Sequence, residues 1–190
     1  STGVTTSTIS PATSVTTVYT VTGESNGCST TKTATVTVNP VPLLTVNNAA
    51  VCSGSSTTLT ATPSVPGGTY TWLPSNQASS SISVTPLSSN NYTVMYSVNG
   101  CSTSAVANVT VTPVPQVNVP SSSICAGDSK TLTATPSITG GTYSWGSTGQ
   151  TNQNINVTPS TTSVYTVTYS LNGCTATATA TVTVNQNPIL

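Results

Sequence analysis

The chain has almost no charged side chains. Its 190 residues contain two Lys, two acidic residues, no His and no Phe, and the formal net charge is zero. Nucleic-acid binding requires a basic surface that displaces counterions from phosphates, so this composition excludes it. General acid–base catalysis requires positioned titratable groups, and only Asp128 and Lys130 lie close together in the sequence. We therefore expect no enzyme activity and no cofactor.

Two further classes are excluded by what is scarce. A Ca²⁺ site requires several carboxylates, and the two acidic residues, Glu24 and Asp128, lie far apart in the sequence. No segment approaches the roughly 20 apolar residues of a membrane-spanning helix. Ser and Thr fill more than a third of the positions, and Val is also abundant. Because Val and Thr favour strands, we predict an all-β chain without a metal site or a membrane span.

The sequence repeats with a period of 73 residues. The positions that recur at this step share chemistry as well as spacing: Cys28, Cys101 and Cys174; Cys52 and Cys125; Trp72 and Trp145; Tyr19, Tyr92 and Tyr165. The predicted units are 1–40 (the C-terminal half of a repeat), 41–113 and 114–186 (full repeats), and 187–190 (the start of another). Because the first and last of these units are only parts of a repeat, we expect the sequence to be a segment of a much longer protein.

Within a unit, apolar and hydroxyl side chains alternate with a period of two, which indicates strands with one buried face. Thr33–Val38 shows the pattern without a fault, with Ala and Val on one face and Thr on the other. We place Lys32, just before this segment, on the Thr face. The other predicted strands are 58–61, 69–72, 81–84, 92–96 and 177–184.

Turn signals separate these strands. Asn-Gly pairs at 26–27, 99–100 and 172–173 predict two-residue type I′ hairpin turns. About seven short strands per repeat, with a Trp on the third, predict a tandem array of immunoglobulin-like β-sandwich repeats. Prolines at the joints 39–42 and 112–115 restrict the backbone, so we expect semi-rigid linkers and a rod-like array.

The aromatic residues have two interpretations. Trp72 and Trp145 each share a strand face with a Tyr two residues earlier, which would also suit a sugar-stacking platform. We favour the sandwich core, because no Phe is available to fill it. The predicted core residues are Trp72, Trp145, Tyr70, Tyr143, Tyr92 and Tyr165. The Thr rows would suit an ice-binding surface, but the twist of such sheets spoils a regular lattice match.

Five cysteines at repeating positions indicate disulfides in an oxidising, extracellular setting: Cys28, Cys52, Cys101, Cys125 and Cys174. Without His there is no Cys–His nucleophile, and without a C-x-x-C motif a zinc site is not indicated.

Two disulfide pairings remain open. The simple choice encloses one unit each, as Cys52–Cys101 and Cys125–Cys174. In the standard strand order, however, those cysteines lie at opposite ends of a sandwich, about 20 Å apart for strands of about six residues. A disulfide needs Cα atoms within about 7 Å. We therefore favour an inter-repeat bond, Cys52–Cys174, with Cys28 and Cys101 pairing upstream and Cys125 downstream.

The repeat also carries a family resemblance. It runs Cys52-Ser-Gly, Thr58–Ala61, Gly68–Trp72, Val84-Thr85-Pro86, Tyr92-Thr93-Val94, Asn99-Gly100-Cys101 and Val109-Thr110-Val111. This pattern resembles the tandem immunoglobulin-like or PKD-like repeats of large surface and secreted proteins of Bacteroidota, including gliding-motility adhesins. The resemblance implies cell-surface display and export by type 9 secretion. The acidic motifs of many PKD domains are missing, so it implies no calcium binding.

Two classes of function follow. In the first, the chain is a stalk or fibre segment of an extracellular adhesin or filament, and its partners are neighbouring copies or other repeats of the same protein. In the second, each repeat binds a surface polysaccharide. Near-zero charge removes the repulsion that keeps proteins apart, which favours self-association and the first class.

Overall fold

The computed structural model describes residue 5 and residues 7–188. Over that range the regular elements are seventeen β-strands, with no helix, so the all-β prediction is confirmed. No helix in the described part of the chain has the length and apolar character needed to cross a membrane. The outermost expected boundaries, at residues 1 and 190, lie outside the described residues.

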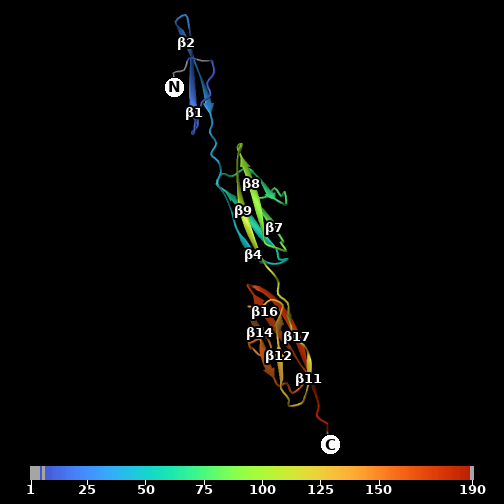
Figure 1. Ribbon diagram of the computed structural model, residues 1–190. Coiled ribbons are helices and arrows are strands. Elements are labelled where there is room, and N and C mark those ends of the chain that lie inside the picture. Colours follow the sequence, from blue (N-terminus) through green and yellow to red (C-terminus); the bar gives the residue numbers. More distant parts are fainter. Residues whose placement is uncertain (1–4, 6, 189–190) are drawn as a thin grey trace. The chain divides into compact units, whose positions relative to one another are not determined.

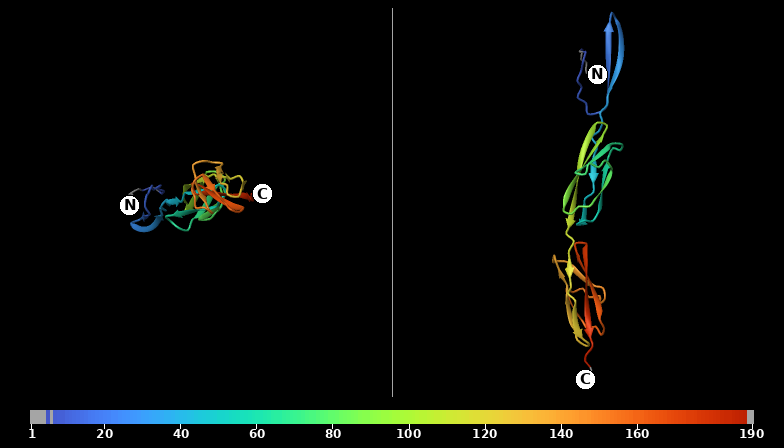
Figure 2. Two further views of the ribbon diagram at one scale, coloured as in Figure 1. Left: turned by 90° about the horizontal axis from the view of Figure 1, so that it is seen from below. Right: turned by 90° about the vertical axis from the view of Figure 1, so that its right-hand side faces the viewer.

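The first segment forms one antiparallel hairpin. Strands β1 (Thr17–Ser25) and β2 (Cys28–Val36) pair along their whole length as a two-stranded sheet. Positive φ angles of 52° at Asn26 and 80° at Gly27 fit the predicted type I′ turn. Figure 2 shows β1 and β2 as a ribbon with no second sheet on either face. Most of the hairpin's side chains are therefore exposed, including Val18 and Val21.

The expected position of Lys32 is wrong. Lys32 lies directly opposite Val21, and Ala34 lies opposite Tyr19. Directly opposed residues of an antiparallel pair project to the same face, so Lys32 shares the Tyr/Ala/Val face rather than the Thr face. Lys32 lies two residues before Ala34, and residues two apart in a strand project to the same face, so the sequence itself places Lys32 with Ala34. The side chain is exposed all the same, since no second sheet covers that face.

Strands β3 to β9 form two sheets. The strand order is β3-β5-β7 in the first and β4-β9-β8-β6 in the second. Strand β4 pairs with β9 in parallel, and β3 pairs with β5 in antiparallel. The strands are β3 (Leu44–Val46), β4 (Ala49–Cys52), β5 (Thr57–Pro63), β6 (Thr69–Leu73), β7 (Ser81–Val84), β8 (Asn90–Val98) and β9 (Cys101–Thr112) (Figure 1). This is the seven-strand immunoglobulin-like sandwich expected from the sequence.

Strands β10 to β17 repeat that arrangement. The larger sheet has the order β11-β17-β16-β14, again with a parallel pair, β11 and β17. The smaller sheet is divided into two ladders, β10-β13 and β12-β15. The strands are β10 (Val117–Asn118), β11 (Ser122–Cys125), β12 (Lys130–Thr133), β13 (Thr135–Pro136), β14 (Thr142–Trp145), β15 (Asn154–Val157), β16 (Ser163–Leu171) and β17 (Cys174–Asn185).

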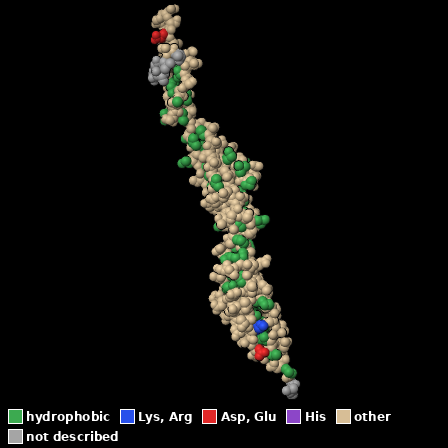
Figure 3. All heavy atoms as spheres, in the orientation of Figure 1, with side chains coloured by type: hydrophobic (Ala, Val, Ile, Leu, Met, Phe, Trp, Pro, Cys, Tyr) green, Lys and Arg blue, Asp and Glu red, His purple; other side chains and the backbone are tan. Residues whose placement is uncertain are grey.

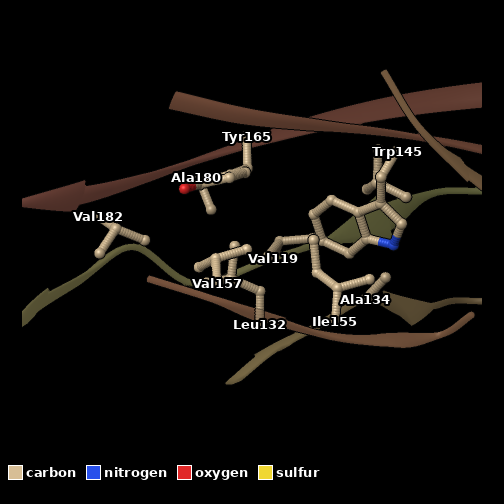
Figure 4. Packing of buried hydrophobic residues seen from close by; sticks show 10 residues of the cluster. Val119, Leu132, Ala134, Trp145, Ile155, Val157, Tyr165, Ala180 and Val182 are labelled. Atoms are coloured by element: carbon tan, nitrogen blue, oxygen red, sulfur yellow. The ribbon is translucent and has the colours of Figure 1, made fainter. Parts of the chain in front are cut away.

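A hydrophobic cluster centred on Trp145 fills this second sandwich. Leu132, Ile155 and Val157 come from the smaller sheet, and Trp145 and Val182 from the larger one. Figure 4 shows these side chains gathered between the ribbons, with the indole above Ile155 and Ala134. The alternating burial of β15 and β16 follows from their period-two sequences, because every second side chain points into this layer.

Each sandwich contains a tyrosine whose hydroxyl is hydrogen-bonded to the backbone of a loop. The Tyr169 hydroxyl donates to the carbonyl of Ile138 (2.7 Å) and accepts from the amide of Gly141 (2.7 Å). The Tyr96 hydroxyl makes the equivalent bonds to Val65 and Gly68. The glycines lie directly against these rings. A Cβ at residue 141 would lie 2.2 Å from the carbonyl oxygen of Ser170.

Gly141→Ala is therefore expected to destabilise the second sandwich by several kcal/mol, because backbone and a buried ring block the added methyl group. Urea denaturation measures the change. Gly146→Ala is the matched control, since nothing lies within 4 Å of an added Cβ there and its φ is not positive. Equal urea midpoints for the two variants would show that the loop adjusts to the added methyl group without loss of stability.

The described chain forms two compact units. One consists of Ser1–Asn47, Thr60–Ile82 and Tyr92–Ala107, and the other of Asn48–Leu59, Ser83–Asn91 and Asn108–Leu190. Cys52, Cys125 and Cys174 all belong to the second unit. This division does not test the repeat boundaries at 41–113 and 114–186, which stay a prediction.

Candidate functional site

Cys52 is the last residue of the short strand β4 and is half-buried. The parallel register places it beside Thr112 of β9, whose carbonyl accepts a hydrogen bond of 2.9 Å from the Ser53 amide. The chain then turns, and the Ser55 amide donates to the Cys52 carbonyl (2.9 Å). Backbone bonds on both sides therefore fix Cys52 at this end of the first sandwich.

Cys174 is the first residue of β17, directly after the Asn172-Gly173 turn. It lies opposite Leu171 in the β16–β17 ladder and is 2% exposed. Its Sγ lies 3.9 Å from the carbonyl oxygen of Thr112, the same carbonyl that fixes the Cys52 turn. The tight hairpin therefore holds this sulfur at the place where the chain leaves β9.

Cys52 and Cys174 are joined in a disulfide. Their Cα atoms are 5.7 Å apart, although 122 residues separate them in the sequence. The bond connects the end of a strand predicted to belong to one repeat with the hairpin turn of the next. The alternative pairs, Cys52–Cys101 and Cys125–Cys174, are absent, and Cys101 and Cys125 have free thiols.

The remaining cysteines occupy equivalent positions. Cys101 is shifted by one period from Cys174, and its Sγ lies 3.6 Å from the carbonyl oxygen of Asn39, the residue equivalent to Thr112. Cys28 follows the first hairpin turn in the same way and is exposed. Like Cys174, both residues therefore directly follow an Asn-Gly hairpin turn and begin a strand.

Cys125 has the backbone setting of Cys52. The Ala126 amide donates to the Asn185 carbonyl (2.9 Å), and the Asp128 amide donates to the Cys125 carbonyl (3.1 Å). These bonds reproduce those around Cys52 one period earlier. The Cys125 side chain is exposed and lines a shallow depression of about 510 Å³ that also includes Asp128 and Lys130.

Sequence reasoning missed this cluster, in which two of the chain's four charged residues lie with a free thiol. The available signal was their spacing, three and five residues after Cys125. Figure 3 shows a basic and an acidic side chain on this part of the molecule and an acidic side chain on the β1–β2 hairpin. The described residues contain no group of three or more His, Cys, Asp or Glu that could hold a metal ion.

Four of the six predicted core aromatics are buried in the sandwiches, whereas Tyr70 and Tyr143 are only half-buried. Trp72 and Trp145 are fully buried, and Tyr92 and Tyr165 are 8% exposed. The indole Nε1 of Trp72 donates to the Ser79 carbonyl (2.8 Å), and that of Trp145 donates to the Asn152 carbonyl (3.0 Å). These bonds satisfy the only polar atom of each buried indole.

Tyr70 and Tyr143 are half-buried beside the hydroxyl-fastened tyrosines. Their ring centroids lie 4.8 Å from Tyr96 and 5.0 Å from Tyr169 in tilted contacts. Partial burial raises the pKa of Tyr143, and the neighbouring Tyr169 phenol raises it further. Each of these two rings therefore packs against a tyrosine whose hydroxyl is hydrogen-bonded to a loop.

No protein-family model and no curated protein matches the chain. Among solved structures, an I-band fragment of titin is 13% identical with a TM-score of 0.50, over 90% of this chain and 75% of that one. The five-domain immunoglobulin fragment of Sidekick-1 is 15% identical (TM-score 0.37; 93% of this chain, 47% of that one). A four-domain Dscam1 fragment is 14% identical (TM-score 0.36; 84% and 51%). At these identities the titin likeness shows the fold alone, and the two weaker likenesses carry no argument.

Proposed function

We propose that the chain is a structural repeat segment of an extracellular stalk or fibre, whose consecutive immunoglobulin-like repeats are joined by disulfides. The observation that carries this proposal is the Cys52–Cys174 bond, which links the end of β4 in one predicted repeat to the start of β17 in the next, across 122 residues. Such a bond adds nothing to a ligand site, but it limits how far the linker at 112–115 lets the two sandwiches separate. A covalent link between neighbouring repeats is the property expected of an array that carries tension.

An extracellular location is consistent with this disulfide chemistry, because disulfides form and persist in oxidising compartments. The sequence resemblance to surface and secreted repeat proteins of Bacteroidota supports display on a cell surface after export by a type 9 secretion system. An adhesin or a filament is the type of protein in which such repeats occur.

The aromatic residues do not support the polysaccharide-binding alternative. Stacking on a sugar requires an exposed ring face, whereas Trp72 and Trp145 are fully buried and hydrogen-bonded to the loops beside them. Neither the pocket lined by Pro115, Val117 and Pro136 nor the depression beside Cys125 contains an aromatic side chain. We therefore keep the structural role as the single proposal.

Peptide mapping under non-reducing conditions tests the bridge. The chain is alkylated and digested with pepsin at low pH, where thiol–disulfide exchange is suppressed because thiols stay protonated. We expect a peptide that links Cys52 to Cys174, together with alkylated Cys28, Cys101 and Cys125. A peptide that links Cys52 to Cys101 would enclose single repeats and contradict the proposed inter-repeat bond.

A further inference from the structure

Strand β17 is paired on both sides over only part of its length. On one side, the β16 ladder covers it from Cys174 to Val182. On the other side, β11 pairs with Val182–Asn185 alone. Within the part of the chain that the structure describes, no strand covers that other side of residues 174–181. The first half of β17 is therefore an open sheet edge.

The hydrogen-bond pattern identifies the free backbone groups of this edge. In an antiparallel ladder, alternate residues direct their N–H and C=O groups away from the neighbouring strand. The Thr181 amide is one of these, because it donates to the hydroxyl of Ser121 (3.0 Å), which directly precedes β11. Thr175, Thr177 and Thr179 alternate in step with Thr181, so each presents an N–H and a C=O to the open side. From residue 175 to residue 179 these groups span about 14 Å at the rise of a strand.

A groove of about 570 Å³ lies between this edge and strand β10. Val117 of β10 and Ala176 of β17 line it. Val117 and the neighbouring Ala178 are half-buried and pack against the core of the second sandwich. None of the residues that line the groove is charged, and all of them belong to the second compact unit. The groove thus combines free backbone hydrogen-bonding groups with an uncharged, partly apolar floor.

We propose that this groove binds an extended peptide strand, which pairs with the open edge of β17 and continues the larger sheet. The peptide exchanges main-chain hydrogen bonds with the three threonines whose backbone groups are free, in the manner of strand addition. Its alternate side chains lie on Val117, Ala176 and Ala178, so small apolar residues fit there. An ionised side chain at those positions would be buried without a partner, which excludes a charged residue.

A short peptide with the same alternation is a suitable probe. Residues 179–185 (Thr-Ala-Thr-Val-Thr-Val-Asn) alternate apolar and hydroxyl side chains and carry no charge. A synthetic peptide of this sequence, labelled with fluorescein, is titrated with the full oxidised chain while fluorescence anisotropy is recorded. We expect a saturable rise in anisotropy that an excess of unlabelled peptide reverses. The absence of a rise would overturn the proposal.

The first sandwich supplies substitutions that fill the groove with residues that the fold already accommodates. Position 44 is equivalent to position 117 and holds Leu, and position 103 is equivalent to position 176 and holds Thr. Val117→Leu/Ala176→Thr is therefore expected to remain folded, which circular dichroism and the urea midpoint check. Peptide binding should weaken at least about tenfold, because the added atoms occupy the floor on which the peptide side chains lie. An unchanged affinity would place the peptide elsewhere on the chain and overturn the proposal.

Two controls separate backbone pairing from recognition of the hydroxyl side chains. Thr179→Val changes an exposed side chain on the outer face but keeps the backbone groups, so the affinity should stay within about twofold of the wild type. A peptide with Asp in place of its fourth residue should not bind, because the carboxylate would lie on the uncharged floor. Weakening by Thr179→Val equal to that of the groove variant, or undiminished binding of the Asp peptide, would contradict the proposed mode of binding.

Hydrogen exchange locates the pairing residue by residue. In the presence of saturating peptide, exchange at the amides of Thr175, Thr177 and Thr179 should slow at least about tenfold, because these amides gain acceptors. The amides of Ala176 and Ala178 already pair with β16 and should change little. Slowing confined to a different strand would overturn the proposal. This inference goes beyond the structural role, and the variants retain the Cys52–Cys174 bond, so its failure is distinguishable from a failure of the proposed function.

Discussion

Trp145→Ala is expected to lower the free energy of unfolding of the second sandwich by about 4 kcal/mol, as is usual when a buried aromatic side chain is truncated. Trp145 is fully buried in the cluster with Leu132, Ile155 and Val182. Its removal leaves a cavity that strands fixed by paired ladders cannot close. It also leaves the Asn152 carbonyl without its 3.0 Å hydrogen bond.

In chemical denaturation of the Trp145 variant, the first sandwich serves as an internal reference. After the substitution Trp72 is the only tryptophan, so its fluorescence reports the first sandwich while circular dichroism reports the whole chain. We expect the two transitions to separate. Val164→Ala is the control on β16, because its side chain is 58% exposed and should change stability by less than about 0.5 kcal/mol. Coincident transitions at the wild-type midpoint would contradict the assigned core.

The largest effect is expected from removal of the disulfide. A bond that closes a loop of this length removes entropy from the unfolded chain, which a chain-entropy treatment values at about 5 kcal/mol. The double variant Cys52→Ser/Cys174→Ser should therefore unfold at a much lower denaturant concentration than the oxidised wild type. Using both substitutions avoids leaving a free thiol at the 2%-exposed Cys174 position.

Two comparisons isolate the contribution of the bond. Dithiothreitol should lower the midpoint of the wild type to that of the double variant and leave the double variant itself unchanged. Cys125→Ser removes an exposed free thiol and should match the wild type. A double variant as stable as the oxidised wild type would show that the bond contributes no net stability.

The strands that the sequence predicted well are those with a strict alternation. Segments such as 92–96 and 177–184 have one apolar face. A shift of the strand register by one residue would expose that face to water, so only one register buries it. The Asn-Gly turns were predictable for a similar reason, because a two-residue hairpin needs positive φ at both central positions.

The first strand of each repeat was not predicted. Residues 44–52 divide into β3 and β4, which belong to different sheets, and β4 pairs with β9 in parallel. No local pattern encodes this exchange, since it depends on which sheet edge is free after the later strands have paired. Asn47 and Asn48 mark the crossing, and the amides of Thr60 and Asn108 donate to their side chains.

The candidate site was predictable only in part. Equal spacing identified the cysteines, and strand length argued against a bond within one sandwich. The cluster of Cys125, Asp128 and Lys130 depends on a turn whose fold is set by the Asn185 carbonyl, some 60 residues later in the chain. Likewise, no local sequence pattern indicates that Gly68 and Gly141 lie directly against the rings of Tyr96 and Tyr169.

The position of the disulfide also determines how the chain would transmit tension. A pull applied to the two ends of the segment reaches Cys52 and crosses directly to Cys174 through the sulfur–sulfur bond. The residues between them would carry no load while the bond is intact, whereas β3 and β4 before Cys52 and β17 after Cys174 would remain under tension. Reduction would release the 122-residue separation, about 400 Å of extended chain. A reducing agent would thus add the residues enclosed by the bond to the length of chain that unfolding under tension can release.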